Sequence, residues 1–172
     1  KAFVIYKWIC LNISYDTQKY FSGNYRTYGD PAEVTFKTRT SVCEGYARLY
    51  KKMCDIAGLE AVYISGYSKG FGYDPTKGLP RNTDHAWNAV KIDGKWYLVE
   101  STWGAGSIDD KTRKFEWNYN ENWFMTPPEQ FILTHLPEED KWQLLNNKIN
   151  KQEFQRRSKF TPEFFAYGFD HN

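Results

Sequence analysis

The chain has 172 residues, which is enough for one well-buried domain and too few for two comfortable ones. Its formal net charge is only +2 and its basic residues are scattered, so it has no electrostatic footprint for nucleic acid or an anionic membrane. No apolar run approaches the roughly 20 residues that a membrane span needs. We therefore expect a globular domain with neither nucleic acid nor membrane among its partners.

Cysteine and histidine usage bounds the chemistry. The odd, low count of three cysteines argues against a disulfide scaffold and favours a reducing, cytoplasmic location. A secreted form stays open, because the chain begins with Lys1 rather than an initiator Met. No C-x-x-C pair exists and the histidines are far apart in sequence, so we expect no metal site and no cofactor. The residues concerned are Cys10, Cys43, Cys54, His85, His135 and His171.

The first part of the chain reads as two helices separated by a loop. Apolar residues in 1–13 predict a first helix, and the polar stretch 15–40, punctuated by Gly, Asn and Pro, predicts mainly loop. From Tyr46 to Ala57 apolar residues recur at helical spacing, which predicts a second amphipathic helix. Ser41 is expected to cap this helix in a capping box with Glu44, and Gly58 to end it.

Alternating patterns then replace the helical period. Residues 61–67 predict a strand, 68–84 a long loop, and 85–92 and 95–100 a hairpin around Asp93-Gly94, a strong two-residue turn signal. A second loop is expected over 104–123, a short helix behind Pro127-Pro128, and a charged helix over 151–157. Helices followed by an antiparallel sheet predict an α+β fold.

Cys43 lies at the predicted start of the second helix. Unpaired N–H groups and the partial positive charge of a helix N-terminus favour a thiolate there, and the same N–H groups could bind an oxyanion. A small buried cysteine near a helix end would give the same pattern. Cys54 falls on the apolar face three turns away and is expected in the core.

The hairpin supplies an independent signal. With Asp93-Gly94 as the turn, His85 would oppose Thr102, and Glu100 would be its diagonal neighbour on the same face of the sheet. Glu100 could then accept the ring N–H of His85 and turn the other ring nitrogen towards Cys43, as the acid of a catalytic triad does. A simple surface pair of His85 and Glu100 is the other interpretation of the same register.

Three strings surround these residues: SVCEGYA at 41–47, HAWN at 85–88 and WYLVESTW at 96–103. Together they resemble the core motifs of the transglutaminase-like superfamily, and within it the kyphoscoliosis peptidase and hillarin group. The similarity extends through TWGAG at 102–106, WFMTPPE at 123–129, HLP at 135–137 and WQLL at 142–145. It covers nearly the whole chain, from Trp8 to about Phe154.

The resemblance implies a papain-like core in which a helix carrying the cysteine packs on an antiparallel sheet carrying the histidine and the acid. Cys43 matches the family nucleophile and His85 the family base. The third family position is normally Asp and is Glu100 here, a departure that fits either a working triad or a detuned one. Residues 1–155 are expected to form the catalytic domain, and 156–172 a C-terminal extension that resembles the start of a further domain.

The function expected from these residues is thiol-dependent acyl transfer on a protein substrate, with peptidase-like action on a cytoskeletal protein favoured by the resemblance. Water as the acceptor would make a peptidase or amidase, and a lysine amine would make a crosslinking transglutaminase; the sequence leaves both open. The alternative is a catalytically inactive domain that kept the fold as a protein-interaction module. The sequence does not indicate the oligomeric state.

Overall fold

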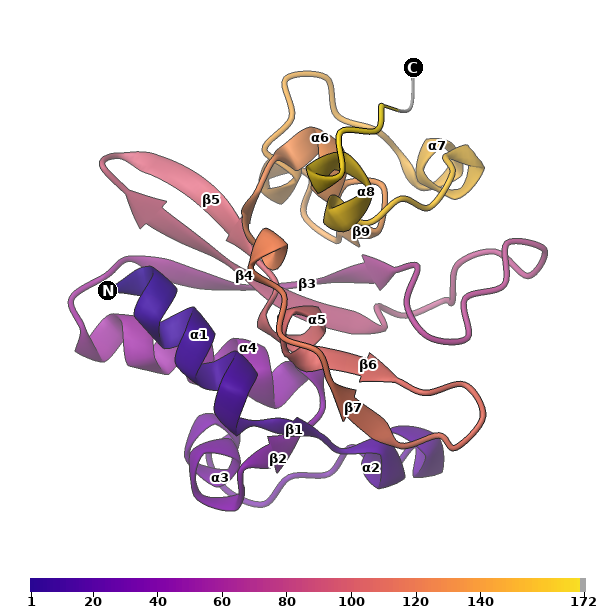
Figure 1. Cartoon of the computed structure of the whole chain (residues 1–172). Coiled ribbons are helices and arrows are strands. Elements are labelled where there is room, and N and C mark those ends of the chain that lie inside the picture. The colour runs from indigo at the N-terminus through magenta and orange to yellow at the C-terminus, as the bar shows by residue number, and fades with distance from the viewer. Residues whose placement is uncertain (171–172) are drawn as a thin grey trace.

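The centre of the fold is a five-stranded antiparallel sheet in the order β8-β5-β4-β3-β9 (Figure 1). The computed structural model describes residues 1–170. The strands are β3 (Ala61–Ser68), β4 (His85–Ile92), β5 (Lys95–Val99), β8 (Phe124–Thr126) and β9 (His135–Pro137). The expected α+β class is confirmed, with the helices of the first part of the chain against one face of this sheet.

The hairpin between β4 and β5 has the expected register. Ile92 pairs with Lys95, and pairing continues to Asn88 and Val99. Both turn residues have positive φ, 49° at Asp93 and 79° at Gly94. That backbone twist matches the twist of the strands, and Asp-Gly adopts it at low cost.

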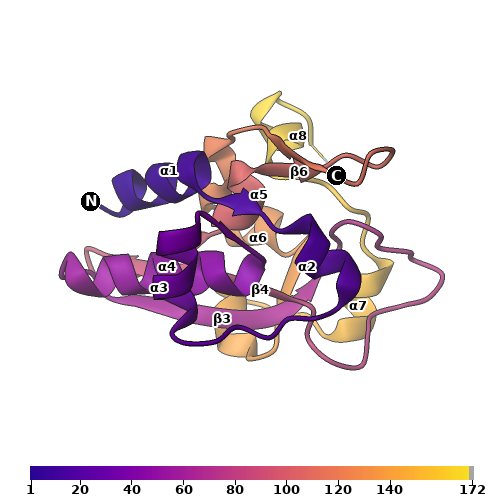
Figure 2. The same cartoon turned by 90° about the horizontal axis from the view of Figure 1, so that it is seen from below.

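Helix α4 (Cys43–Ile56) packs on β3 and β4, and α1 (Ala2–Asn12) packs on α4 (Figures 1 and 2). The amphipathic pattern of α4 is confirmed, since its apolar face is buried while its charged face is exposed. Each large side chain removed from water on this face contributes about 1.5–3 kcal/mol of stability. The buried residues of α4 are Gly45, Tyr46, Ala47, Leu49, Tyr50 and Cys54.

The start of α4 differs from the expected capping box. Its N-cap is Val42, which offers no side-chain hydrogen bond, and Glu44 instead pairs with Arg48 at 2.8 Å. Ser41 belongs to β2 (Thr40–Ser41), which pairs in parallel with β1 (Ser14–Tyr15). The helix therefore begins at Cys43, directly after its N-cap Val42, and its first N–H groups have no side-chain cap. At the other end, Gly58 has the expected left-handed φ of 74°.

The prediction of loop over 15–40 is wrong. The segment holds two short helices, α2 (Thr17–Ser22) and α3 (Pro31–Thr38). Asp16 caps the first and Asp30 the second, with Pro31 at the first helical position. Capping side chains satisfy the initial N–H groups, and they compensate here for a weak apolar pattern.

The prediction of loop over 104–123 is also wrong in part. A short helix α5 (Ser101–Ala105) leads into a small hairpin of β6 (Gly106–Ile108) and β7 (Phe115–Trp117), followed by the 3-10 helix η1 (Glu121–Trp123). The strands are only three residues long, too short for alternation to predict them.

The C-terminal part of the described chain comprises α6 (Pro128–Phe131), η2 (Asp140–Gln143), α7 (Lys151–Arg156) and α8 (Pro162–Ala166). The helices expected after Pro127-Pro128 and over 151–157 are present. Helix α8 packs against α6 and η1 (Figure 1). The division at residue 155 stays a prediction, and His171 lies outside the described residues. No helix in residues 1–170 is long and apolar enough to cross a membrane.

Candidate active site

Cys43 is the first residue of α4 and is partly exposed. Its side chain lies next to the ring of His85, the first residue of β4, and raises the pKa of that ring. Asn88, three residues further along β4, connects helix and sheet. Its side-chain amide donates at 2.9 Å to Ala47 O in α4 and at 2.9 Å to Val62 O in β3. Helix and strand thus hold the thiol and the imidazole together.

The other two cysteines lie in the core. Cys10 and Cys54 are fully buried, and burial raises the pKa of both thiols, that of Cys54 to about 11. All three cysteines are free thiols. Cys43 is therefore the cysteine that solvent can reach.

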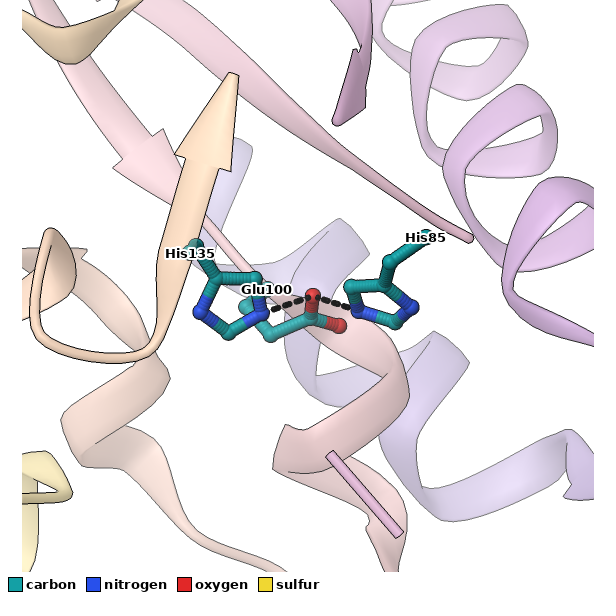
Figure 3. Close-up of side chains that lie close together, drawn as sticks. All are labelled: His85, Glu100 and His135. Atoms are coloured by element: carbon teal, nitrogen blue, oxygen red, sulfur yellow. Dashed lines mark hydrogen bonds and ion pairs between the residues drawn. The ribbon is translucent and has the colours of Figure 1, made fainter. Parts of the chain in front are cut away.

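Glu100 contacts one of the two nitrogens of the His85 ring. Its Oε2 is 2.7 Å from Nε2 of His85, and Nδ1 lies on the other side of the ring, away from the carboxylate (Figure 3). The structure thus brings together all three residues that the sequence suggested. Both His85 and Glu100 are buried, so this is not the surface pair that the sequence also allowed.

Glu100 contacts His85 from a different structural element than the expected strand. Strand β5 ends at Val99, and Glu100 is the N-cap of α5, so His85 does not oppose Thr102 in a ladder. The Oε1 of Glu100 accepts from the N–H of Thr102 at 2.7 Å and of Trp103 at 3.1 Å. Free N–H groups at a helix start attract a carboxylate, which is why the chain turns here instead of extending the strand.

The charges in the site stabilise one another. Burial opposes charge on both groups, yet the pKa of His85 is raised well above its ordinary value by Glu100 and Cys43, and the pKa of Glu100 is lowered by His85 and His135. Each ring or carboxylate favours the charged form of its partner. A protonated His85 beside an ionised Glu100 is the arrangement that stabilises a thiolate at Cys43.

His135 lies in the same cluster as Cys43, His85 and Glu100, which the spacing of residues in the sequence did not predict. Its Nε2 lies 3.2 Å from Oε2 of Glu100, on the side away from His85 (Figure 3). Residue 135 is in β9 and pairs with Ser68 of β3, while His85 in β4 pairs with Gly66, so the two rings meet across β3 with centroids 5.2 Å apart. A Cβ at Gly66 would collide with the Trp87 ring and the Leu136 carbonyl. A glycine inside a strand was the available signal of this close approach.

The ligand atoms of His85, Glu100 and His135 lie within 4.8 Å of one another, a grouping that could hold a metal ion. A zinc ion needs bonds of about 2.0–2.1 Å to ring nitrogens and carboxylate oxygens, with these atoms spread around it. The 2.7 Å contact between His85 and Glu100 is a direct hydrogen bond instead. The donor set therefore fits proton sharing better than metal binding.

A thiol at a helix start, an imidazole on the adjoining strand and a buried carboxylate define the class of folds on which cysteine peptidases and thiol-dependent acyltransferases are built. The chain belongs to the transglutaminase-like superfamily, whose family model matches residues 1–101.

The chain is similar to kyphoscoliosis peptidase, with 40% identity to the Mus musculus protein and 39% to the Homo sapiens protein over 95% of its length. It is 32% identical to hillarin of Drosophila melanogaster over 98% of its length. The chain spans about a quarter of these relatives, 24%, 24% and 21% respectively. Among solved structures, it is similar to a TGase, with a TM-score of 0.46 and 20% identity over 70% of this chain and 30% of that one.

Proposed function

We propose that this domain catalyses thiol-dependent acyl transfer on protein substrates, with Cys43 as nucleophile, His85 as base and Glu100 as the orienting acid. The observation that supports it most is the continuous line of contacts from the partly exposed thiol through the buried ring to the buried carboxylate. A buried ion pair costs stability unless its geometry is favourable, so a functional role is a reason to keep one. Here the His85–Glu100 pair adjoins the partly exposed sulfur of Cys43.

In the first step, the Cys43 sulfur attacks a substrate carbonyl and forms a carbon–sulfur bond. The N–H groups of Cys43 and Glu44, at the uncapped start of α4, are placed to stabilise the oxyanion that develops. The carbon–nitrogen bond then breaks, and the proton on His85 goes to the departing amine or ammonia. A thioester on Cys43 remains.

In the second step, His85 takes a proton from an incoming nucleophile, which attacks the thioester and returns the thiolate. Water releases an acid and makes the domain a peptidase or amidase. A lysine amine forms an isopeptide bond and makes it a transglutaminase. The buried carboxylate of Glu100 holds the ring in the same orientation through both steps.

The substrate class follows the relatives. The name kyphoscoliosis peptidase supports peptide-bond hydrolysis as the first choice. A cytoskeletal substrate and a cytoplasmic location belong to the proposal and rest on the family resemblance and on the three free thiols.

Exposed aromatic side chains favour a second candidate, a non-catalytic interaction module. On α2 and the segment after it, Phe21, Tyr25 and Tyr28 have 39%, 50% and 87% of their surface exposed. Aromatic side chains of this kind anchor protein interfaces.

Intact-protein mass spectrometry separates the two candidates. The chain is incubated with a carbobenzoxy-glutamine or peptide acyl donor, with or without a fluorescent primary amine. We expect a thioester adduct on the wild type and on Cys54→Ala, and none on Cys43→Ala. No adduct on folded wild type with any donor would favour the interaction module. Release of free acid or of amide then identifies the acceptor.

A further inference from the structure

His135 is a fully buried histidine that the proposed reaction does not use. Four aromatic rings enclose it, with centroids 4.4 Å away for Phe131 and Trp103, 5.1 Å for Trp87 and 5.5 Å for Trp123. A polar ring buried among apolar ones is costly unless both of its nitrogens are satisfied. Its two polar contacts therefore define what it does.

The Thr134 hydroxyl and the Glu100 carboxylate together decide which nitrogen of His135 carries the proton. The Thr134 hydroxyl lies 2.8 Å from Nδ1 of His135 and 3.2 Å from the Phe131 carbonyl. That carbonyl already accepts the Thr134 N–H at 3.1 Å. The ionised Glu100 carboxylate can only accept, so the neutral His135 ring carries its proton on Nε2, the atom that faces Glu100. Nδ1 is then the acceptor, and the Thr134 hydroxyl is placed to donate to it at the shorter of its two distances.

Three N–H groups then hydrogen-bond the Glu100 carboxylate, and Nε2 of His135 lies beside it at 3.2 Å without the geometry of a full hydrogen bond. Oε1 accepts two backbone N–H groups, and Oε2 lies between Nε2 of His85 and Nε2 of His135 (Figure 3). We propose that His135, held by Thr134, is a positioning residue that fixes the orienting acid of the reaction. This inference rests on the proposed function and adds a second histidine to it.

Burial keeps His135 neutral. Burial lowers its pKa to about 4, with Glu100 acting in the opposite direction and His85 and Lys159 adding to the lowering. A neutral His135 faces Glu100 with an N–H group without competing for the charge of Glu100, so that charge remains available to His85. His85 itself faces Glu100 and Cys43, and Asp84 precedes it.

Three variants test the role. His135→Phe removes the donor and suits the aromatic surroundings; His135→Gln can return an N–H to the place of Nε2; Thr134→Val frees the ring to change tautomer. We expect His135→Phe to lower kcat by about 10- to 100-fold with a smaller change in KM, because a misplaced orienting group costs that much. The acid limb of the pH profile of kcat in His135→Phe should move to higher pH, because Glu100 loses a neighbour that favours its ionised form. His135→Gln should recover most of the loss and Thr134→Val should show part of it.

A wild-type kcat and pH profile in His135→Phe would overturn the proposal, as would a His135→Gln variant no better than His135→Phe. Should His135→Phe fail to fold, a wild-type profile in Thr134→Val would overturn it as well. Nitrogen-15 NMR of the histidine rings measures the protonation state and tautomer of His135 in the wild type, independently of turnover. At about pH 7 we expect a neutral His135 protonated at Nε2. The opposite tautomer or an imidazolium would refute the positioning role, whereas absent thioester formation would refute the proposed function alone.

Discussion

Glu100→Gln is the substitution that tests the site most selectively. The side chain keeps its length, and its amide oxygen can still accept the N–H groups of Thr102 and Trp103 that Oε1 accepts now. The amide NH₂ then replaces Oε2, where it meets Nε2 of His85 at 2.7 Å and Nε2 of His135 at 3.2 Å. Two ring N–H groups would face a donor, so His85 is driven to the tautomer with its proton on Nδ1, towards Cys43.

The magnitude follows from that tautomer. A ring protonated on the side of the thiol cannot take the thiol proton, and the neutral amide no longer stabilises an imidazolium. In a serine protease, the same exchange of acid for amide lowers kcat by about 10⁴-fold. We expect a loss of about 10³- to 10⁴-fold here, which is about 4–5.5 kcal/mol of transition-state stabilisation.

Glu100→Asp separates charge from reach. Aspartate is a good N-cap and keeps the charge, but it is shorter by one carbon–carbon bond, roughly 1.5 Å. Its loss should be smaller than that of the glutamine variant. The assay is single-turnover thioester formation, with circular dichroism of each variant to show that it is folded. A glutamine variant within about threefold of wild type would mean that Glu100 does not orient His85.

Further predictions concern stability. Below pH 6.5 His135 binds a proton in the unfolded chain, whereas in the folded chain it stays neutral until about pH 4. The free energy of unfolding should therefore decrease as the pH is lowered from 6.5 to 4, by up to about 3 kcal/mol. His135→Phe should remove this loss in urea unfolding; His85, with a raised pKa, contributes in the opposite direction, its stabilisation being lost as pH rises. Gly45→Ala should destabilise the fold by about 1–3 kcal/mol, because the new Cβ would collide with the side chains of Ser41 and Thr35. An unchanged Tm in that variant would show that the start of α4 is more loosely packed than described.

Much of the site could be predicted because its signals are local. The apolar spacing of α4 and the Asp93-Gly94 turn each depend on a few adjacent residues, and they placed Cys43 and His85 correctly at the starts of a helix and a strand. Extending the ladder to Glu100 failed, since the N–H groups of α5 attract the carboxylate out of the strand. The capping box failed because Ser41 is used in pairing with β1.

His135 could not be predicted from spacing. It reaches Glu100 only because β9 pairs with the end of β3, which is 67 residues earlier in the chain at the Ser68–His135 pair. Such long-range pairing leaves no periodic trace in the sequence, since β9 itself is only three residues long. The small strands and capped helices of 15–40 and 104–123 were missed because they are short and have a weak apolar pattern.

The most direct test of an activated Cys43 is its rate of alkylation. Iodoacetamide modification of Cys10, Cys43 and Cys54 is followed by peptide mass spectrometry in the wild type and in His85→Ala, across a range of pH. We expect Cys43 to react far faster than the two buried thiols, and near neutral pH to slow at least about tenfold in His85→Ala, because the thiolate loses its imidazolium partner. Equal rates for Cys43 in the two proteins would contradict a His85-activated nucleophile.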